Sequence, residues 1–328
     1  MKTAGIVEQP WDCLIILDAC RYDYFERTWN TYLKGQLEKR VSIGSSTNEW
    51  RDKSFPGFYD DIVYISANPQ ICDKSAVYGY TAGEHFGKVC EVWRDHWDGE
   101  IGTVRPETVT RVALEIIRRT PNKRFVVHYL QPHAPYLSLS AEARGYLNGD
   151  VNTVRRLVGA ETGRAMNRAG NRLLKYVSKA FRGAGILPNH PEWMVRKLLR
   201  IPARAPLESA WRTTGRQGLR RAYAENLDAV LKDVAELVRH LSGGIVVTSD
   251  HGELLGERGC YGHPTGSDHR ILREVPWLVI NRPAVSEHDA QGEDGEARAP
   301  STGPHKDVVA QEEQQELSDK LRALGYFD

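Results

Sequence analysis

Short runs of apolar and β-branched residues recur along the chain, bounded by glycine, proline or polar residues. Such runs predict buried strands, whereas apolar residues spaced three and four positions apart predict amphipathic helices. The predicted strands cover residues 13–17, 62–68, 124–130, 245–248 and 275–280. The predicted helices cover residues 105–120, 219–241 and 316–325. Strands and helices that alternate in this way are typical of an α/β fold.

Residues that can bind a metal follow three of these strands. Asp18 comes directly after the first strand, and Asp250 and His251 follow the strand at 245–248. His133 lies between two prolines just after the third strand. Ligands bind at the carboxyl ends of the strands in open α/β sheets, and a carboxylate and an imidazole can share a divalent metal. An isolated Asp-His pair is equally consistent with a cap or a turn, so the prediction depends on the three strand ends meeting.

Four segments together resemble the sulfatase-like branch of the alkaline phosphatase superfamily. They are residues 17–23 (Leu-Asp-Ala-Cys-Arg-Tyr-Asp), 132–136 (Pro-His-Ala-Pro-Tyr), 248–253 (Thr-Ser-Asp-His-Gly-Glu) and 262–264 (Gly-His-Pro). The resemblance covers roughly residues 10–137 and 222–282. It implies an alkaline-phosphatase-like core, with a mixed, mostly parallel sheet between helices. It also implies an enzyme that hydrolyses or transfers phosphate or sulfate esters.

The resemblance further implies a nucleophile beyond the first helix. Ser45, Ser46 and Thr47 precede a predicted helix, whose amide donors and dipole would favour an attacking oxyanion. Ordinary helix capping explains these residues equally well. Thr47 is the first choice, because Arg51 follows it at the spacing that arginine has after the sulfatase nucleophile. Ser45 is the second choice, from its similarity to lipoteichoic-acid-synthase-like transferases, and the sequence leaves both open.

Other residues acquire expected roles from the same resemblance. Asn68, twenty-one residues beyond Thr47, would donate to a nonbridging substrate oxygen, although Asn68-Pro69 also fits a simple turn. Arg21 and Arg51 are the expected substrate-binding cations. His133 or His263 would protonate the leaving group.

The expected cofactor is one divalent metal ion held by Asp18, Asp250 and His251. Mn²⁺, Zn²⁺, Mg²⁺ and Ca²⁺ are all compatible with a mixed carboxylate and imidazole site. Glu253 and His269 are candidates for a second metal, which we do not favour, because the chain has no convincing copy of the Asp-x-x-x-His pair of two-metal relatives.

The balanced overall charge of +1 conceals a strong asymmetry. Residues 141–222 contain 17 Lys and Arg but 5 Asp and Glu, a net charge of +12, so the rest of the chain carries −11. The stretches 171–182 and 193–201 mix cations with apolar residues at helical spacing, which predicts either a lid packed on the core or a surface for an anionic membrane or lipid-linked substrate. Nucleic acid is not an expected partner, since the chain has no recognisable binding motif.

The chain is expected to be organised in four parts. Residues 1–137 and 222–283 form the catalytic core, 138–221 a basic helical insertion, 284–305 a flexible linker and 306–328 a C-terminal helix. The first residues lack an apolar signal region, and the five cysteines lack CxxC spacing. Both observations favour a cytoplasmic protein with reduced thiols. If the basic insertion binds lipid, the protein would be peripheral to the inner membrane surface. Cys20 is interpreted as core packing, because the Cys-x-Pro-Ser-Arg motif of sulfatases is absent.

The function predicted from these features is a metal-dependent phosphoester hydrolase or phosphotransferase that acts through a covalent intermediate on its hydroxyl nucleophile. A sulfatase is the close alternative. From a different class, the same cleft could belong to a catalytically inactive module that binds an anionic glycan or lipid. The oligomeric state is left open.

Overall fold

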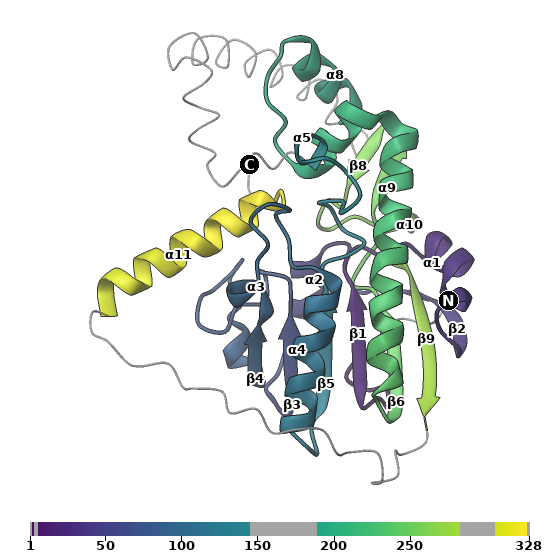
Figure 1. Ribbon diagram of the computed structural model, residues 1–328, viewed down its shortest axis with the longest axis vertical. Coiled ribbons are helices and arrows are strands. Elements are labelled where there is room, and N and C mark those ends of the chain that lie inside the picture. Colours follow the sequence, from purple (N-terminus) through teal and green to yellow (C-terminus); the bar gives the residue numbers. More distant parts are fainter. Residues whose placement is uncertain (1, 3–5, 145–188, 283–305, 327–328) are drawn as a thin grey trace.

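The computed structural model describes residues 2, 6–144, 189–282 and 306–326 (Figure 1). Its central sheet has seven strands in the order β2-β9-β6-β1-β5-β3-β4. These strands are β1 (Cys13–Leu17), β2 (Gln36–Val41), β3 (Tyr59–Ser66), β4 (Phe86–Glu91), β5 (Arg124–Tyr129), β6 (Gly243–Thr248) and β9 (Glu274–Arg282). β9 runs antiparallel to β2 and β6, whereas the pairs among β6, β1, β5, β3 and β4 are parallel. The predicted mixed, mostly parallel α/β sheet is therefore confirmed.

Helices cover both faces of this sheet (Figure 1). The described helices are α1 (Tyr22–Thr28), α2 (Thr47–Ser54), α3 (Val92–Asp95), α4 (Pro106–Arg119), α5 (Ala141–Arg144), α8 (His190–Leu198), α9 (Pro206–Arg239), α10 (Arg270–Arg273) and α11 (Lys306–Ala323), with 3₁₀ turns η1 (Trp29–Thr31) and η2 (Ala82–Glu84). None of the described helices is long and apolar enough to cross a bilayer.

The apolar runs form strands because both faces of the sheet are buried. Successive side chains of a strand point to opposite faces. In β1, Cys13, Ile15 and Leu17 join the core that contains the apolar faces of α4, α9 and α11. Leu14 and Ile16 join the second core, on the α2 side. A strand buried on both faces needs apolar residues at every position, which explains the continuous runs.

A small cap stands over the carboxyl ends of the strands (Figure 1). It consists of α5, α8, the start of α9 and the hairpin of β7 (Leu254–Glu257) and β8 (Cys260–Gly262). Its core is aromatic, with Trp193, Trp211 and Tyr261 packed together. α9 consists of two helical segments joined at a kink at Gly215, and the second segment runs across residue 222, the expected boundary of the insertion. Residues 145–188 of the expected insertion, and the expected linker, lie outside the described residues.

Candidate active site

Two acids meet because two strands from opposite ends of the chain pair in parallel. β1 and β6 are neighbours in register, with Ile16 opposite Thr248, so Asp18 and Asp250 leave the same sheet edge together. Both side chains are fully buried. Asp250 Oδ1 accepts hydrogen bonds from the backbone N–H of Ala19 at 3.1 Å and of His251 at 2.9 Å. One oxygen of Asp250 is thus fixed by the backbone, and Oδ2 faces the site.

The hydroxyl of Thr47 points at this second oxygen. Thr47 is the first residue of α2, and its Oγ1 donates to Asp250 Oδ2 at 2.7 Å and lies 3.3 Å from His251 Nε2. The preceding loop packs tightly on the helix, since a Cβ on Gly44 would lie 2.4 Å from the backbone nitrogen of Trp50. Glycine at position 44 therefore allows the loop with Ser45, Ser46 and Thr47 to lie against the start of the helix.

Ser45 has a different environment. Its Oγ lies 2.9 Å from Glu49 Oε2 and 3.0 Å from the carbonyl oxygen of Pro264, and it accepts from the N–H of Ser267 at 3.0 Å. These contacts tie the loop to the turn around residue 264. Of the two candidate nucleophiles left open by the sequence, the structure brings Thr47 to the acids and gives Ser45 a scaffolding environment.

Asp18 lies beside a histidine that the sequence analysis missed. His128, within β5, is fully buried, and its Nε2 lies 3.8 Å from Asp18 Oδ2. His251 Nε2 lies 3.8 Å from Asp18 Oδ1 and 3.3 Å from Asp250 Oδ2. The sequence does contain a signal for His128, because it is a histidine within an otherwise apolar strand. From the sequence alone it is interpreted only as part of that strand.

We call Asp18, Thr47, His128, Asp250 and His251 the acidic cluster. The ligand atoms of Asp18, His128 and Asp250 lie within 4.8 Å of one another. Asp18 Oδ1 and His128 Nε2 are buried without a hydrogen bond. Two buried carboxylates with an unsatisfied oxygen are unfavourable unless a cation neutralises them. The donor set therefore fits a divalent metal.

The pKa values of the acidic cluster also show that burial disfavours its charged forms. Burial, and next the charge of Asp250, raise the pKa of Asp18 well above its usual value. Burial also lowers the pKa of His128 to about 4 and that of His251 well below its usual range. Both imidazoles are thus held neutral, the form that binds metals.

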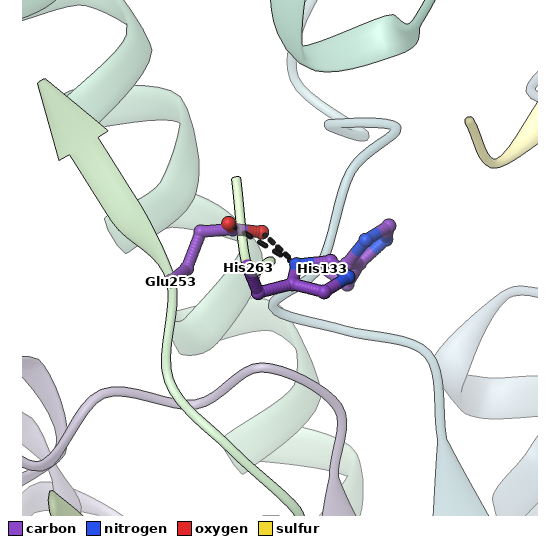
Figure 2. Close-up of side chains that lie close together, drawn as sticks. All are labelled: His133, Glu253 and His263. Carbon is purple, nitrogen blue, oxygen red and sulfur yellow. Dashed lines mark hydrogen bonds and ion pairs between the residues drawn. The ribbon is translucent and has the colours of Figure 1, made fainter. Parts of the chain in front are cut away.

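A second group, which we call the histidine cluster, consists of His133, Glu253 and His263 (Figure 2). His263 Nδ1 lies 3.2 Å from both carboxylate oxygens of Glu253. The ring of His133 lies edge-on to that of His263, with centroids 5.1 Å apart. The ring centroid of His263 is also 4.4 Å from that of His251, so the two clusters are contiguous.

The protonation states within the histidine cluster differ. Burial opposes a charge on His263, but Glu253 outweighs it and raises the pKa of His263. Burial would raise the pKa of Glu253, yet the charge of His263 lowers it. His133 has no such partner, so burial and then His263 lower its pKa to about 4. A protonated His263 paired with an ionised Glu253 follows.

The turn that carries His133 is held by α9. Asn226 is fully buried, and its Nδ2 donates to the carbonyl oxygens of His133 and Pro135 at 3.2 Å each. Its Oδ1 accepts from the N–H of Leu137 at 2.8 Å. The predicted scaffold helix thus also positions a site residue.

Three sequence candidates have other partners. Arg21 is paired with Asp23 at 2.9 Å and with Glu257 at 2.8 Å. The guanidinium of Arg51 is buried and donates to the carbonyl oxygens of Gln70 and Val77. His269 caps α10 by accepting from the N–H of Ile271. The structure uses these residues to hold loops and gives them no place in either cluster.

Asn68 also differs from its expected role. Its Nδ2 donates to Asp18 Oδ2 at 2.6 Å and lies 3.4 Å from the hydroxyl of Tyr326, and its Oδ1 accepts from the N–H of Gln70 at 2.8 Å. An amide has two N–H donors, and both have protein partners. Asn68 therefore orients Asp18, which corrects the expectation that it donates to substrate. Tyr326 itself was missed, because no sequence pattern links residue 326 to residue 68.

No family model matches the chain, and no curated protein matches it significantly. Among solved structures, the C-terminal periplasmic domain of EptC from Escherichia coli, in complex with Zn, is 12% identical with a TM-score of 0.48, covering 86% of this chain and 75% of that chain. The corresponding domain of phosphoethanolamine transferase EptC from Campylobacter jejuni is 12% identical with a TM-score of 0.45, covering 85% and 82%. Phosphonate monoester hydrolase of Agrobacterium radiobacter is 13% identical with a TM-score of 0.45, covering 83% and 68%.

The neighbour from Campylobacter jejuni is thus a phosphoethanolamine transferase, and the neighbour from Agrobacterium radiobacter is a phosphonate monoester hydrolase. At such identities and TM-scores the likeness carries no argument about activity. The activity has to be inferred from the chemistry of the site.

Proposed function

We propose that the protein is a metal-dependent hydrolase or transferase of phosphoesters, with Thr47 as its nucleophile. The observation that carries the proposal is the 2.7 Å hydrogen bond from Thr47 Oγ1 to Asp250 Oδ2, at a helix start and beside a second buried acid. A helix start offers unpaired N–H groups to an anion. A hydroxyl that contacts a metal-binding carboxylate in this setting is suited to attack at phosphorus.

Asp18 and Asp250, together with His251 or His128, would hold the metal. When bound, the ion supplies Lewis acidity towards the ester and lowers the pKa of a neighbouring hydroxyl. The mixture of carboxylate and imidazole ligands favours Mn²⁺ or Zn²⁺ over Mg²⁺ and Ca²⁺. The carboxylate of Asp250 also gives the hydroxyl of Thr47 a fixed direction.

The reaction needs two displacements at phosphorus. In the first, Thr47 Oγ1 forms a bond to phosphorus, the bond to the leaving oxygen breaks, and the hydroxyl proton leaves along the hydrogen bond to Asp250. His263, charged through Glu253, donates a proton to the leaving oxygen and becomes neutral. In the second, neutral His263 accepts a proton from water or an alcohol as that molecule attacks phosphorus. The bond from phosphorus to Thr47 Oγ1 breaks, and Oγ1 regains its proton along the hydrogen bond to Asp250.

The test is turnover of aryl phosphate diesters, monoesters and sulfates by the full chain, with and without added Mn²⁺ or Zn²⁺. We expect metal-dependent turnover of a phosphate ester. Turnover of sulfates alone would identify a sulfatase. A metal-loaded protein without any turnover would support the anion-binding module.

A lipid-linked substrate is a second proposal, and the exposed side of α8 supports it. Met194, Leu198 and Leu199 are 50%, 82% and 37% exposed. Arg196, however, is buried against Glu208 at 3.2 Å and cannot contribute to a surface. We expect sedimentation with anionic liposomes that weakens with salt and with the double change Leu198→Ser and Arg200→Ser, whereas Arg118→Ser on α4 has no effect.

A further inference from the structure

The end of the chain brings a tyrosine to the junction of the two clusters. The hydroxyl of Tyr326 lies 3.4 Å from Asn68 Nδ2, the atom that also donates to Asp18 Oδ2. Its ring stacks on that of His133, with centroids 5.7 Å apart, and meets His263 edge-on at 6.3 Å. Tyr326 therefore touches the histidine cluster directly. It touches the acidic cluster through Asn68 and through the carboxylate of Asp18, whose pKa its hydroxyl lowers against the effect of burial.

The backbone conformation at the end of α11 orients the side chain of Tyr326. Gly325 has φ +87°, a conformation that glycine adopts without strain. The N–H of Tyr326 donates to the carbonyl oxygen of Leu321, and that of Gly325 to Arg322, both at 3.0 Å, which is the Schellman pattern of a helix end. A Cβ on Gly325 would lie 2.9 Å from Cβ of Ala205.

Contacts independent of the phenol hydroxyl hold the segment in place. Leu317, Leu321 and Leu324 of the C-terminal segment are buried in the main core. Lys320 Nζ donates to the carbonyl oxygen of Trp93 at 3.0 Å. The hydroxyl of Tyr78 donates to the carbonyl oxygen of Tyr326 at 2.6 Å. The phenol is delivered to the site by packing and backbone hydrogen bonds, so its own O–H is not needed for docking.

We propose that Tyr326 is a substrate-binding residue whose O–H donates to a nonbridging oxygen of the ester at Thr47. This inference rests on the proposed function. The amide donors of Asn68 are both engaged, one by Asp18 and one by the Tyr326 oxygen. Because the phenol oxygen accepts from Asn68, its proton is directed away from Asn68 and towards the Asp18 side of the site. The phenol O–H of the C-terminal segment would thus take the donor role that Asn68 cannot fill, because both of its N–H groups are engaged.

The experiment compares the full-length wild type with Tyr326→Phe, and with Tyr22→Phe as the matched control. The hydroxyl of Tyr22 donates to Glu26 at the surface, and Lys39 lies over its ring, so neither partner belongs to either cluster. Two quantities are measured on metal-loaded protein: kcat/KM for the phosphate ester, and the Kd for inorganic phosphate or vanadate by calorimetry. Loss of one hydrogen bond to a charged oxygen should lower kcat/KM by roughly 10- to 100-fold and weaken oxyanion binding about 10-fold. Metal content and Tm should match those of the wild type.

Other outcomes overturn the proposal in distinguishable ways. Wild-type values for Tyr326→Phe would mean that the ring only packs. Higher activity in Tyr326→Phe would mean that the segment obstructs the site. A wild type that neither turns over esters nor binds phosphate would remove the proposed function and this inference together. Gly325→Ala retains the phenol but displaces it, so it should lower kcat/KM in the same direction, and unchanged kinetics would contradict the positioning argument.

Discussion

The acidic cluster and the histidine cluster are neighbours, yet they differ in how well their charges are satisfied. The acidic cluster places Asp18 and Asp250 together, with two neutral histidines and an oxygen that has no hydrogen bond. The histidine cluster contains its own ion pair, between His263 and Glu253 at 3.2 Å. Only the first cluster needs an added cation to be stable. We therefore propose that the metal binds in the acidic cluster and that the histidine cluster transfers protons.

The largest effect is expected at the nucleophile. Thr47→Ala should lower turnover on the order of 10⁴-fold or more, because no other described hydroxyl contacts Asp250 Oδ2 in the same way. Ser46→Ala is the matched control, since Ser46 lies in the same turn but contacts Asn48 and Thr265. Rapid quenching and identification of the phosphorylated peptide test the assignment. A label on Ser45 would transfer the role to that residue.

The metal ligands should come next. Asp18→Asn and Asp250→Asn should each remove bound metal and lower activity by roughly 10²- to 10³-fold, as expected for a lost charge-stabilising group. Elemental analysis of the purified variants gives the metal content, with Asp228→Asn on the exposed side of α9 as the control. Full metal occupancy in both variants would contradict the proposed difference between the clusters, because the acidic cluster would then not be the metal site.

The histidine cluster should show a smaller effect that depends on the leaving group. His263→Gln should slow alkyl esters by about 10²-fold or more and aryl esters much less, since a good leaving group needs no proton. Glu253→Gln should act differently. Glu253 raises the pKa of His263, so its loss should lower that pKa and move the alkaline limb of the pH-rate profile to lower pH. Loss of metal in either variant would instead indicate a second metal held by His133, Glu253 and His263.

The two clusters also differ in how much of them could be predicted from sequence. Asp18, Asp250 and His251 come within three residues of the ends of apolar runs, and strand ends are where α/β sheets place ligands. Thr47 and Ser45 could not be separated, because their difference lies in long-range contacts with Asp250 and with Pro264. The sheet was predicted from its most apolar strands, whereas β2 and β4, which are more exposed, gave no such signal.

Residues assigned through spacing alone were the least predictable. Arg51 stands at the expected distance from Thr47, yet its guanidinium bonds loop carbonyls. Asn68 reaches the site but faces Asp18. Tyr326 arrives through a helix end whose docking depends on tertiary packing, which no local pattern encodes. Local periodicity indicates which edge of the sheet carries the site residues. Long-range packing determines which of their atoms come into contact.

The smallest expected effect concerns the link between the clusters. Glu49 accepts from the N–H of Ser45 at 2.9 Å and from that of Gly266 at 3.2 Å, and so ties the nucleophile loop to the turn that carries His263. Burial would raise the pKa of Glu49, but Lys53 and these hydrogen bonds lower it to about 2.

Because that pKa is lowered on folding, the stability that Glu49 contributes is complete above its ordinary pKa near 4.5 and is lost as pH falls from there towards 2. Glu49→Gln should lower Tm at pH 6 by roughly 2–4 °C, and the difference from wild type should shrink towards pH 3. Glu225→Gln, on the exposed side of α9, is the control. A Tm difference that stays constant from pH 6 to pH 3 would show that the charge of Glu49 does not hold the two clusters together.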